Sequence, residues 1–316
     1  MPSPDRSIDR LLDRRIIVVT GKGGVGKTSV SLAIGALAAS RGMNTLVCET
    51  NGADQICGSW GMHSGGYAIT PLAPHLSTMS IRAETAIEEY LMRVLRFRKL
   101  YEMVFKNRVM GPFLDAVPGL HDLIQLGKVF DLERERSSVL SGRTRTWDLV
   151  VVDAPATGHG ISMLTAPRGM MRLTRSGPFH DNARDVAGLI EDPARTAIVL
   201  VSLAEELPVF ETVELYGRLG KFQEQVAAVV LNAVRTHGLP ANYPDLRPEL
   251  LARANPAGVE AIALADAALR RSAMQDRARQ SLARLGAPVV DLPEIAGVEL
   301  GPPAFDQLAA VLGQSP

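Results

Sequence analysis

The sequence of 316 residues predicts an α/β fold, in which a doubly wound, mostly parallel sheet carries a helical insert. Short β-branched runs alternate along the chain with segments whose apolar residues recur every three or four positions, a pattern typical of βαβ units. The first run, at 16–20, leads directly into a glycine-rich loop and then into a helical segment. A long stretch of helical periodicity at 82–141 interrupts the alternation and predicts the insert.

The first strand, loop and helix predict a phosphate-binding site. After the strand, residues 21–28 fit the pattern G-x-x-x-x-G-K-[ST], and a helix is expected at 29–41. Glycines let backbone N–H groups face a phosphate without a Cβ clash, and the helix N-terminus adds a partial positive charge. Lys27 is expected on the terminal phosphates and the Thr28 hydroxyl on Mg²⁺. The predicted nucleotide-binding residues here are Gly21, Gly23, Gly24, Val25, Gly26, Lys27, Thr28 and Ser29.

The remaining elements follow from the same periodicities. A strand is expected at 44–50, a loop rich in Gly, Ser and Pro at 51–75, and a short strand at 76–81. Within the insert, Gly111-Pro112 separates two helical stretches. Further along we expect strands at 147–153, 196–202, 226–232 and 287–291, and helices at 160–175, 181–192, 209–221, 246–285 with a break near Pro256, and 304–312. One phosphate-loop domain is predicted over 1–316, with the insert as a subdomain.

Composition narrows the class of protein. Lys plus Arg and Asp plus Glu are equal at 34 each, so no global field favours nucleic acid, and no nucleic-acid partner is expected. Cys48 and Cys57 make no disulfide framework. No apolar run approaches the roughly 20 residues that span a bilayer. The first 14 residues lack the apolar core of a signal peptide, so a cytoplasmic location is expected.

A second lysine, Lys22, lies at the start of the loop. The run G-K-G-G-V-G-K-T resembles the deviant loop of a group of dimeric ATPases. These include the arsenical-pump ATPase, the tail-anchored-protein targeting ATPase and the site-selecting and partitioning ATPases of bacterial division. In that group the extra lysine crosses the dimer interface to the partner's nucleotide. The resemblance therefore implies bound ATP and Mg²⁺, a homodimer or a heterodimer with a related subunit, and a catalytic Lys22.

The strand ending at Asp153 carries a second motif. An acidic residue at the carboxyl end of a strand lies on the ligand side of an α/β sheet, where it can hold Mg²⁺ directly or through water. The run Asp153-Ala-Pro-Ala-Thr-Gly-His159 resembles the family's switch II, D-T-A-P-T-G-H. His159 could relay the switch to the partner or cap a helix. The residues assigned to switch II are Asp153, Ala154, Pro155, Gly158 and His159.

The chain departs from the family after the second strand. Where the targeting ATPases read approximately S-T-D-P-A-H, this chain reads Glu49-Thr-Asn-Gly-Ala-Asp54. Asn51 falls where the family has its water-positioning aspartate, and an amide can orient a water but cannot take its proton. Hydrolysis is therefore expected to be slowed without being abolished. Glu49, on the same face of the strand, could supply the carboxylate, and Asp54 is a weaker substitute. Alternatively none of the three acts and the protein binds ATP as a switch.

The adenine site is implied by the resemblance alone. The family places an asparagine at a strand end, here Asn232, and a proline-containing loop after the last strand, here Pro293. A plain turn residue is the alternative for Asn232.

Two functions stay open. The resemblance implies a targeting-type ATPase that shields or delivers a client, such as a membrane-anchor segment; the alternative is a positioning or regulatory nucleotide switch without chaperone activity. Methionines can line an adaptable apolar groove, although core packing is the favoured interpretation here. The methionines concerned are Met92, Met103, Met110, Met163, Met170 and Met171. Arsenite transport is disfavoured, because a soft metalloid needs three nearby thiols and the chain has two cysteines.

Overall fold

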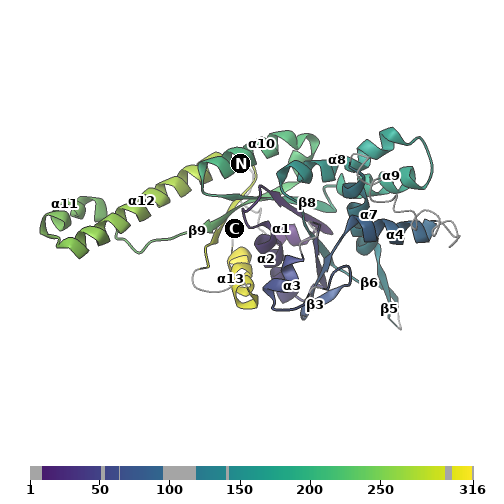
Figure 1. The fold of residues 1–316 in the computed structure, drawn as a ribbon, viewed down its shortest axis with the longest axis horizontal. Coiled ribbons are helices and arrows are strands. Elements are labelled where there is room, and N and C mark those ends of the chain that lie inside the picture. Colours follow the sequence, from purple (N-terminus) through teal and green to yellow (C-terminus); the bar gives the residue numbers. More distant parts are fainter. Residues whose placement is uncertain are drawn as a thin grey trace.

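A computed structural model describes residues 9–50, 54–63, 65–94, 119–139, 142–295 and 301–314. Its centre is an eight-stranded sheet with the strand order β10-β9-β8-β1-β7-β2-β4-β3, flanked by helices (Figure 1). Every neighbouring pair in this sheet is parallel except β3 with β4, which is antiparallel. The predicted doubly wound, mostly parallel α/β fold is confirmed.

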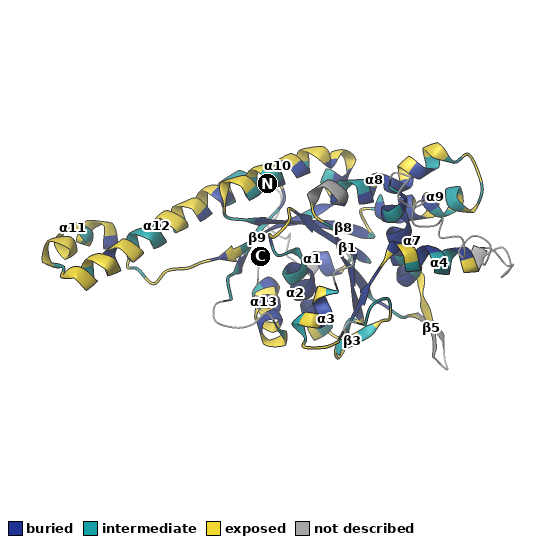
Figure 2. Cartoon of the chain, in the orientation of Figure 1, coloured by how far each residue is buried: buried dark blue, intermediate teal, exposed yellow. Residues whose placement is uncertain are grey.

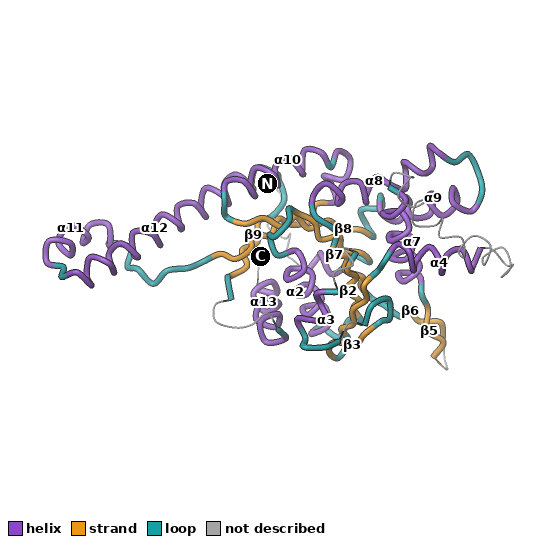
Figure 3. Tube along the Cα trace, viewed as in Figure 1, coloured by secondary structure: helices purple, strands orange, loops and turns teal. Residues whose placement is uncertain are grey.

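The central strands are buried along their whole length. Every residue of β1 (Ile16–Gly21), β2 (Thr45–Glu49) and β7 (Leu149–Asp153) is buried. Such continuous runs are typical of parallel strands that are covered on both faces. The other strands of the sheet, orange in Figure 3, are β3 (Thr70–Ala73), β4 (Leu76–Ser80), β8 (Thr196–Leu203), β9 (Val226–Val234) and β10 (Val289–Pro293).

Helices cover the two faces of the sheet, and each face has its own apolar cluster. One cluster includes side chains of α2 (Lys27–Ser40) and α13 (Pro302–Gln314), with Ile17 and Val19 of β1. The other includes Ile16 and Val18 of the same strand, so alternate residues of β1 serve opposite cores. The helices of this second face are α7 (Leu120–Arg134), α8 (Thr157–Leu173), α9 (Pro178–Ile190), α10 (Glu206–Arg218) and the carboxyl end of α12 (Pro256–Ala283).

The predicted insert is only partly helical. Its described helices are α4 (Ala83–Val94) and α7, while residues 95–118 lie outside the described residues. After α7 the chain forms an antiparallel pair, β5 (Arg136–Val139) with β6 (Gly142–Arg145), so the helical prediction up to residue 141 is wrong at its end. These polar residues pair with each other and not with the main sheet, so no apolar alternation marks them.

The predicted loop at 51–75 contains two elements. α3 (Gln55–Ser59) is a five-residue helix, and β3 is an edge strand that includes Pro71. Proline is tolerated on an edge strand because its missing N–H is not needed by a second neighbour. Residue patterns do not reveal α3 because it is short, and they do not reveal β3 because it contains a proline.

The other described elements are α1 (Asp9–Leu12), a 3-10 helix at Gly220–Gln225 and α11 (Tyr243–Arg253). The break expected near Pro256 is confirmed, because α12 begins at that proline. α11 and the amino-terminal part of α12 form a hairpin that projects from the rest of the molecule (Figure 1). Among the described helices, none combines the length and apolar character needed to cross a bilayer.

Candidate nucleotide-binding site

The phosphate-binding loop connects β1 to α2, and glycine is required at two of its positions. Gly21 has φ 158°, and a Cβ there would lie 2.4 Å from the Val201 carbonyl oxygen. Gly26 has φ 89°, and a Cβ there would lie 2.2 Å from Nδ2 of Asn232. α2 starts after Gly26 without a side-chain cap. The first backbone N–H groups of α2 therefore face outward, which is the arrangement that binds a phosphate.

The two predicted Mg²⁺ ligands meet at the start of α2. Thr28 Oγ1 donates a hydrogen bond of 2.6 Å to Asp153 Oδ2, and Ser31 Oγ donates one of 3.3 Å to Asp153 Oδ1. Asp153 is 1% exposed, and burial raises the pKa of its carboxyl to about 6, against the effect of the Thr28 hydroxyl and Lys27. A hydroxyl beside a buried carboxylate fits Mg²⁺, which takes few protein oxygens and completes its shell with phosphates and water.

The two loop lysines have different surroundings. Lys27 Nζ donates to the Lys22 carbonyl oxygen at 3.0 Å, so its side chain folds back over the loop. Burial lowers the pKa of Lys27, against the opposing charge of Asp153. The Lys22 side chain is 46% exposed and forms an ion pair of 2.5 Å with Glu211 of α10. Residue patterns did not single out Glu211, although the segment 199–221 that contains it resembles the family.

Glu49 ends β2 directly beside Asp153 on β7. Its side chain is fully buried, and its carboxylate accepts hydrogen bonds from the backbone N–H groups of Gln55 at 2.9 Å and Ile56 at 3.3 Å. Burial raises the pKa of Glu49 to about 7, against the effect of these two hydrogen bonds. The carboxylate thus holds the start of α3, a contact that only the folded geometry reveals. Asn51, the residue of the water-positioning prediction, lies outside the described residues.

The predicted adenine residues lie at neighbouring strand ends. Asn232 of β9 donates from Nδ2 to the Val25 carbonyl oxygen at 2.9 Å, which ties this strand to the loop. Pro293 is the last residue of β10, and the next residue, Glu294, donates its N–H to the Val234 carbonyl oxygen at 3.0 Å. The carboxyl ends of β1, β9 and β10 are therefore brought together, while contact with a base stays a prediction for both residues.

A cavity of about 450 Å³ adjoins the loop. Its wall combines the loop, Gln55 and Ser59 of α3, and Ala154, Pro155 and Ala156 of switch II. The wall also includes Phe305 of α13, whose ring stacks on Trp60 with a centroid distance of 5.0 Å. Neither aromatic residue was predicted, because isolated rings carry no motif. The backbone of switch II enters α8 at Thr157, and the side chain of His159 lies outside the description.

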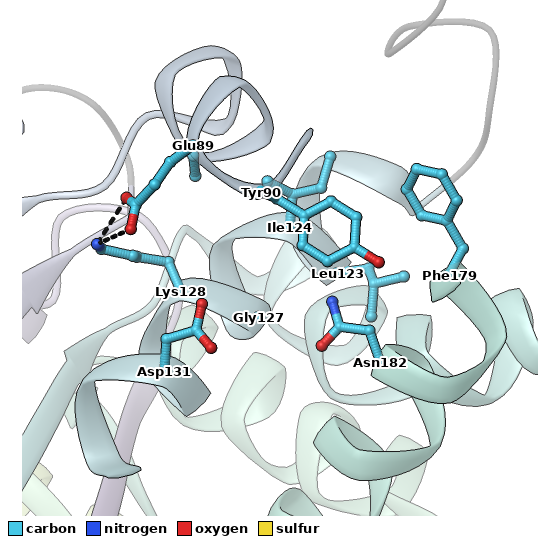
Figure 4. Close-up of a pocket in the computed structure, with 10 residues that line it drawn as sticks. Glu89, Tyr90, Leu123, Ile124, Gly127, Lys128, Asp131, Phe179 and Asn182 are labelled. Carbon is cyan, nitrogen blue, oxygen red and sulfur yellow. Dashed lines mark hydrogen bonds and ion pairs between the residues drawn. The ribbon is translucent and has the colours of Figure 1, made fainter. Parts of the chain in front are cut away.

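A second pocket lies between α4, α7 and α9 (Figure 4). The rings of Tyr90 and Phe179 approach at 5.3 Å between centroids, and Lys128 forms an ion pair of 2.7 Å with Glu89. Its volume of about 20 Å³ is roughly the space of one water molecule. These helices therefore pack against one another and leave no room for a bound helix at this position.

The methionines singled out in the sequence have different surroundings. Met163 and Met170 are buried, and Met171 packs against the same cluster. Met92 is exposed, whereas Met103 and Met110 lie outside the described residues. The two buried side chains confirm core packing at those positions.

Fold and site together define the class. A glycine-rich loop between the first strand of a parallel sheet and a helix, with an acidic strand end beside its threonine, makes this a P-loop nucleotide-binding protein.

Comparison with known proteins gives the family. A family model described as anion-transporting ATPase matches residues 14–176, and the chain belongs to this family. The chain is 29% identical to the ATPase BagA of Mycobacterium tuberculosis over 331 residues, covering 92% of this chain and 91% of the relative. It is 26% identical over 242 residues to a putative arsenical pump-driving ATPase of Halobacterium salinarum (74% and 37%). It is 22% identical over 255 residues to ATPase ASNA1 homolog 2 of Paramecium tetraurelia (69% and 75%).

The family assignment confirms the resemblance to arsenical-pump and targeting ATPases, and it makes the protein an ATP-binding ATPase.

Proposed function

We propose that this ATPase is a nucleotide-driven switch that works as a dimer, either with a second copy or with a related subunit. The observation that carries the proposal is that the two loop lysines have different surroundings. Lys27 folds over its own loop, whereas Lys22 stands at the exposed rim, where Glu211 holds it. A second cation at the rim is available to a nucleotide on a facing subunit, where it would stabilise charge in the transition state.

Each residue then has a defined part in hydrolysis. Lys27 and the backbone N–H groups at the start of α2 bind the phosphates. Thr28 and Asp153 hold Mg²⁺, which neutralises charge on the phosphates when bound. Asn51 orients the attacking water, and slow turnover follows because an amide cannot accept the proton of that water. Switch II, from Asp153 through His159, passes the state of the site on to the partner.

For the client we propose a protein segment and not an oxyanion. A relative named as an arsenical pump-driving ATPase raises the question of a metalloid cargo. Cys48 and Cys57 are both buried here, and burial raises the pKa of Cys48 to about 12, so its thiol stays protonated and is a poor ligand. Delivery or shielding of a protein client is supported by membership of a family whose relatives include ASNA1 homologs.

The mass of the protein in solution tests the switch. With Mg²⁺, ADP and aluminium fluoride, light scattering should show a dimer, and without nucleotide a smaller species. Lys27→Ala should abolish both the dimer and the thermal stabilisation by ATP, since a phosphate contact is lost. Lys22→Ala should keep ATP binding yet reduce hydrolysis by roughly 10³- to 10⁵-fold.

Lys221→Ala serves as the matched control. Lys221 is also an exposed lysine in an ion pair, with Glu191 at 2.7 Å, but it lies outside the site. Its variant should dimerise and hydrolyse ATP like the wild type. An unchanged mass with and without the transition-state analogue would refute the switch as a homodimer.

A further inference from the structure

Side-chain contacts hold the hairpin of α11 and α12 together and fix its root, where it joins the rest of the molecule. We call residues 236–274 the arm. Midway along it the Arg247 guanidinium donates to both carboxylate oxygens of Asp266 at 2.7 to 2.9 Å, which holds α11 against α12. At its root Gln275 accepts a hydrogen bond from the Arg235 N–H at 2.8 Å and donates one to the Arg235 carbonyl oxygen at 2.9 Å. The arm therefore has a defined direction relative to the sheet.

That direction is set by the topology. β9 ends at Val234, and the contact of Gln275 with Arg235 marks where α12 passes the carboxyl edge of the sheet. Residues 256–274 of α12 thus extend beyond this edge, and 19 helical residues span about 28 Å. The phosphate-binding loop follows β1 at the same edge, and Asn232 of β9 touches it. The arm projects outward from the edge that carries the nucleotide site.

The arm is largely exposed (Figure 2) and nevertheless carries many large apolar side chains. Thirteen large apolar side chains are exposed in the described part of the chain, and six of them lie on the arm. They are Leu246, Leu250, Leu251, Val259, Leu264 and Met274. Three more, Leu207, Phe210 and Val213, lie on α10, which pairs with Lys22 through Glu211 and packs against α12. Exposed apolar side chains that gather in this way mark an interaction surface.

The net charge of the arm indicates which kind of molecule contacts its surface. The arm carries four arginines and no lysine, against four acidic residues, so its net charge is zero. A lipid surface or nucleic acid would be favoured by a basic excess, which the arm lacks. A second copy of this chain meets the opposite requirement, because a neutral surface with both signs of charge can face its own copy without repulsion.

We propose that the arm is a clasp of the dimer: the arm of one subunit packs against the second copy when the two nucleotide sites face each other. The inference rests on the proposed function. A dimer in which Lys22 reaches the partner's nucleotide must bring the two carboxyl edges together. An arm that extends about 28 Å beyond that edge then lies alongside the partner. The apolar stripe on α10, beside Lys22, continues the same interface.

The test weakens the arm without touching the nucleotide site. Leu250→Gln combined with Leu264→Gln removes two exposed leucines and keeps good helix formers without adding charge. With Mg²⁺, ADP and aluminium fluoride, the dissociation constant of the dimer should rise at least about tenfold. ATP should stabilise the monomer as in the wild type. Leu173→Gln, on α8, is the matched control, since Leu173 is 67% exposed and Leu264 is 73% exposed; it should change neither property.

Cross-linking locates the contact directly. Leu264→Cys carries a photo-activated cross-linker, and Cys48 and Cys57 are buried and stay unlabelled. In a mixture of ¹⁴N and ¹⁵N protein, peptides of mixed isotope should form only with nucleotide. If the wild type dimerises but the double variant dimerises equally well and cross-links stay within one chain, the clasp is refuted and the arm serves a client or another surface. If the wild type does not dimerise at all, the clasp fails together with the homodimeric form of the proposed switch.

Discussion

At the scale of single residues, the site depends on two carboxyl groups buried at neighbouring strand ends. Burial raises the pKa of Asp153 to about 6 and that of Glu49 to about 7. Each group therefore binds its proton more tightly in the folded chain than in the unfolded chain. This tighter binding increases the free energy of unfolding at low pH. The increase is lost as the pH rises through the pKa that the group has in the folded state. A cation at Asp153 offsets the loss, because it favours the ionised form.

Mg²⁺-dependent stabilisation by ATP should consequently depend on pH. Below about pH 6, protonated Asp153 is a poor ligand, so the extra melting temperature that Mg²⁺ adds to ATP should grow from about pH 5 to about pH 7. Asp153→Asn should remove this increment at every pH. Asp148→Asn is the control, because the Asp148 carboxylate only accepts a hydrogen bond from the Asn44 N–H at 2.9 Å. An increment that is constant with pH would count against Asp153 as a ligand.

Single-turnover hydrolysis distinguishes the roles of Asn51 and Glu49. Asn51→Asp should raise the rate tenfold or more, because a carboxylate accepts the proton of the water. Glu49→Gln should lower the melting temperature but preserve turnover, because the carboxylate that it replaces is bound to the start of α3. The reverse pattern, loss of turnover in Glu49→Gln and no gain in Asn51→Asp, would make Glu49 the base.

At the scale of elements, α10 links the loop to the rest of the molecule through Glu211. The ion pair with Lys22 must break before this lysine can reach a partner. An exposed pair is worth up to about 1 kcal/mol, so Glu211→Gln should tighten the nucleotide-dependent dimer by roughly two- to fivefold. Glu214→Gln, one turn further along α10, alters only a 3.9 Å pair with Arg218 and should have no effect. A weaker dimer in Glu211→Gln would show that Glu211 orients Lys22 for the partner instead of restraining it.

Elements that depend on local patterns were predictable, and those that depend on distant contacts were not. The buried strands and their long helices follow from apolar runs and helical periodicity. α3 exists because Glu49, six residues before Gln55, accepts its first N–H groups, and no periodicity encodes that contact. β3 needs only one neighbour, so its Pro71 is harmless.

The same distinction between local patterns and distant contacts applies to the candidate site. The loop motif predicted Thr28 and the acidic strand end predicted Asp153 as Mg²⁺ ligands, and the two side chains meet although they lie 125 residues apart. Neither pattern could predict that Glu211 would meet Lys22, because that ion pair depends on how α10 packs beside the loop. Phe305 reaches the cavity wall through the position of α13, which no local signal defines.

At the scale of the whole molecule, we propose that one catalytic site needs two chains. The loop, Asp153 and the arm all lie at one edge of the sheet, and a second subunit that faces this edge would complete the site with its Lys22. In the proposed dimer, the arm would set how long the two subunits remain together, and slow hydrolysis at Asn51 would set when they part. A long-lived ATP-bound dimer would suit a protein that holds a client.

Mixing two inactive variants tests this claim most directly. Lys22→Ala should bind ATP but lack the cation that we propose to reach across, whereas Lys27→Ala should keep Lys22 but fail to bind ATP. In a mixed dimer, the ATP on the first variant faces Lys22 of the second, so one complete site forms. Titration of Lys22→Ala with Lys27→Ala should restore ATP hydrolysis to as much as half of the wild-type rate per dimer. If the mixture stays as inactive as its parts while the mixed dimer forms, Lys22 acts within its own chain and the two-chain site is wrong.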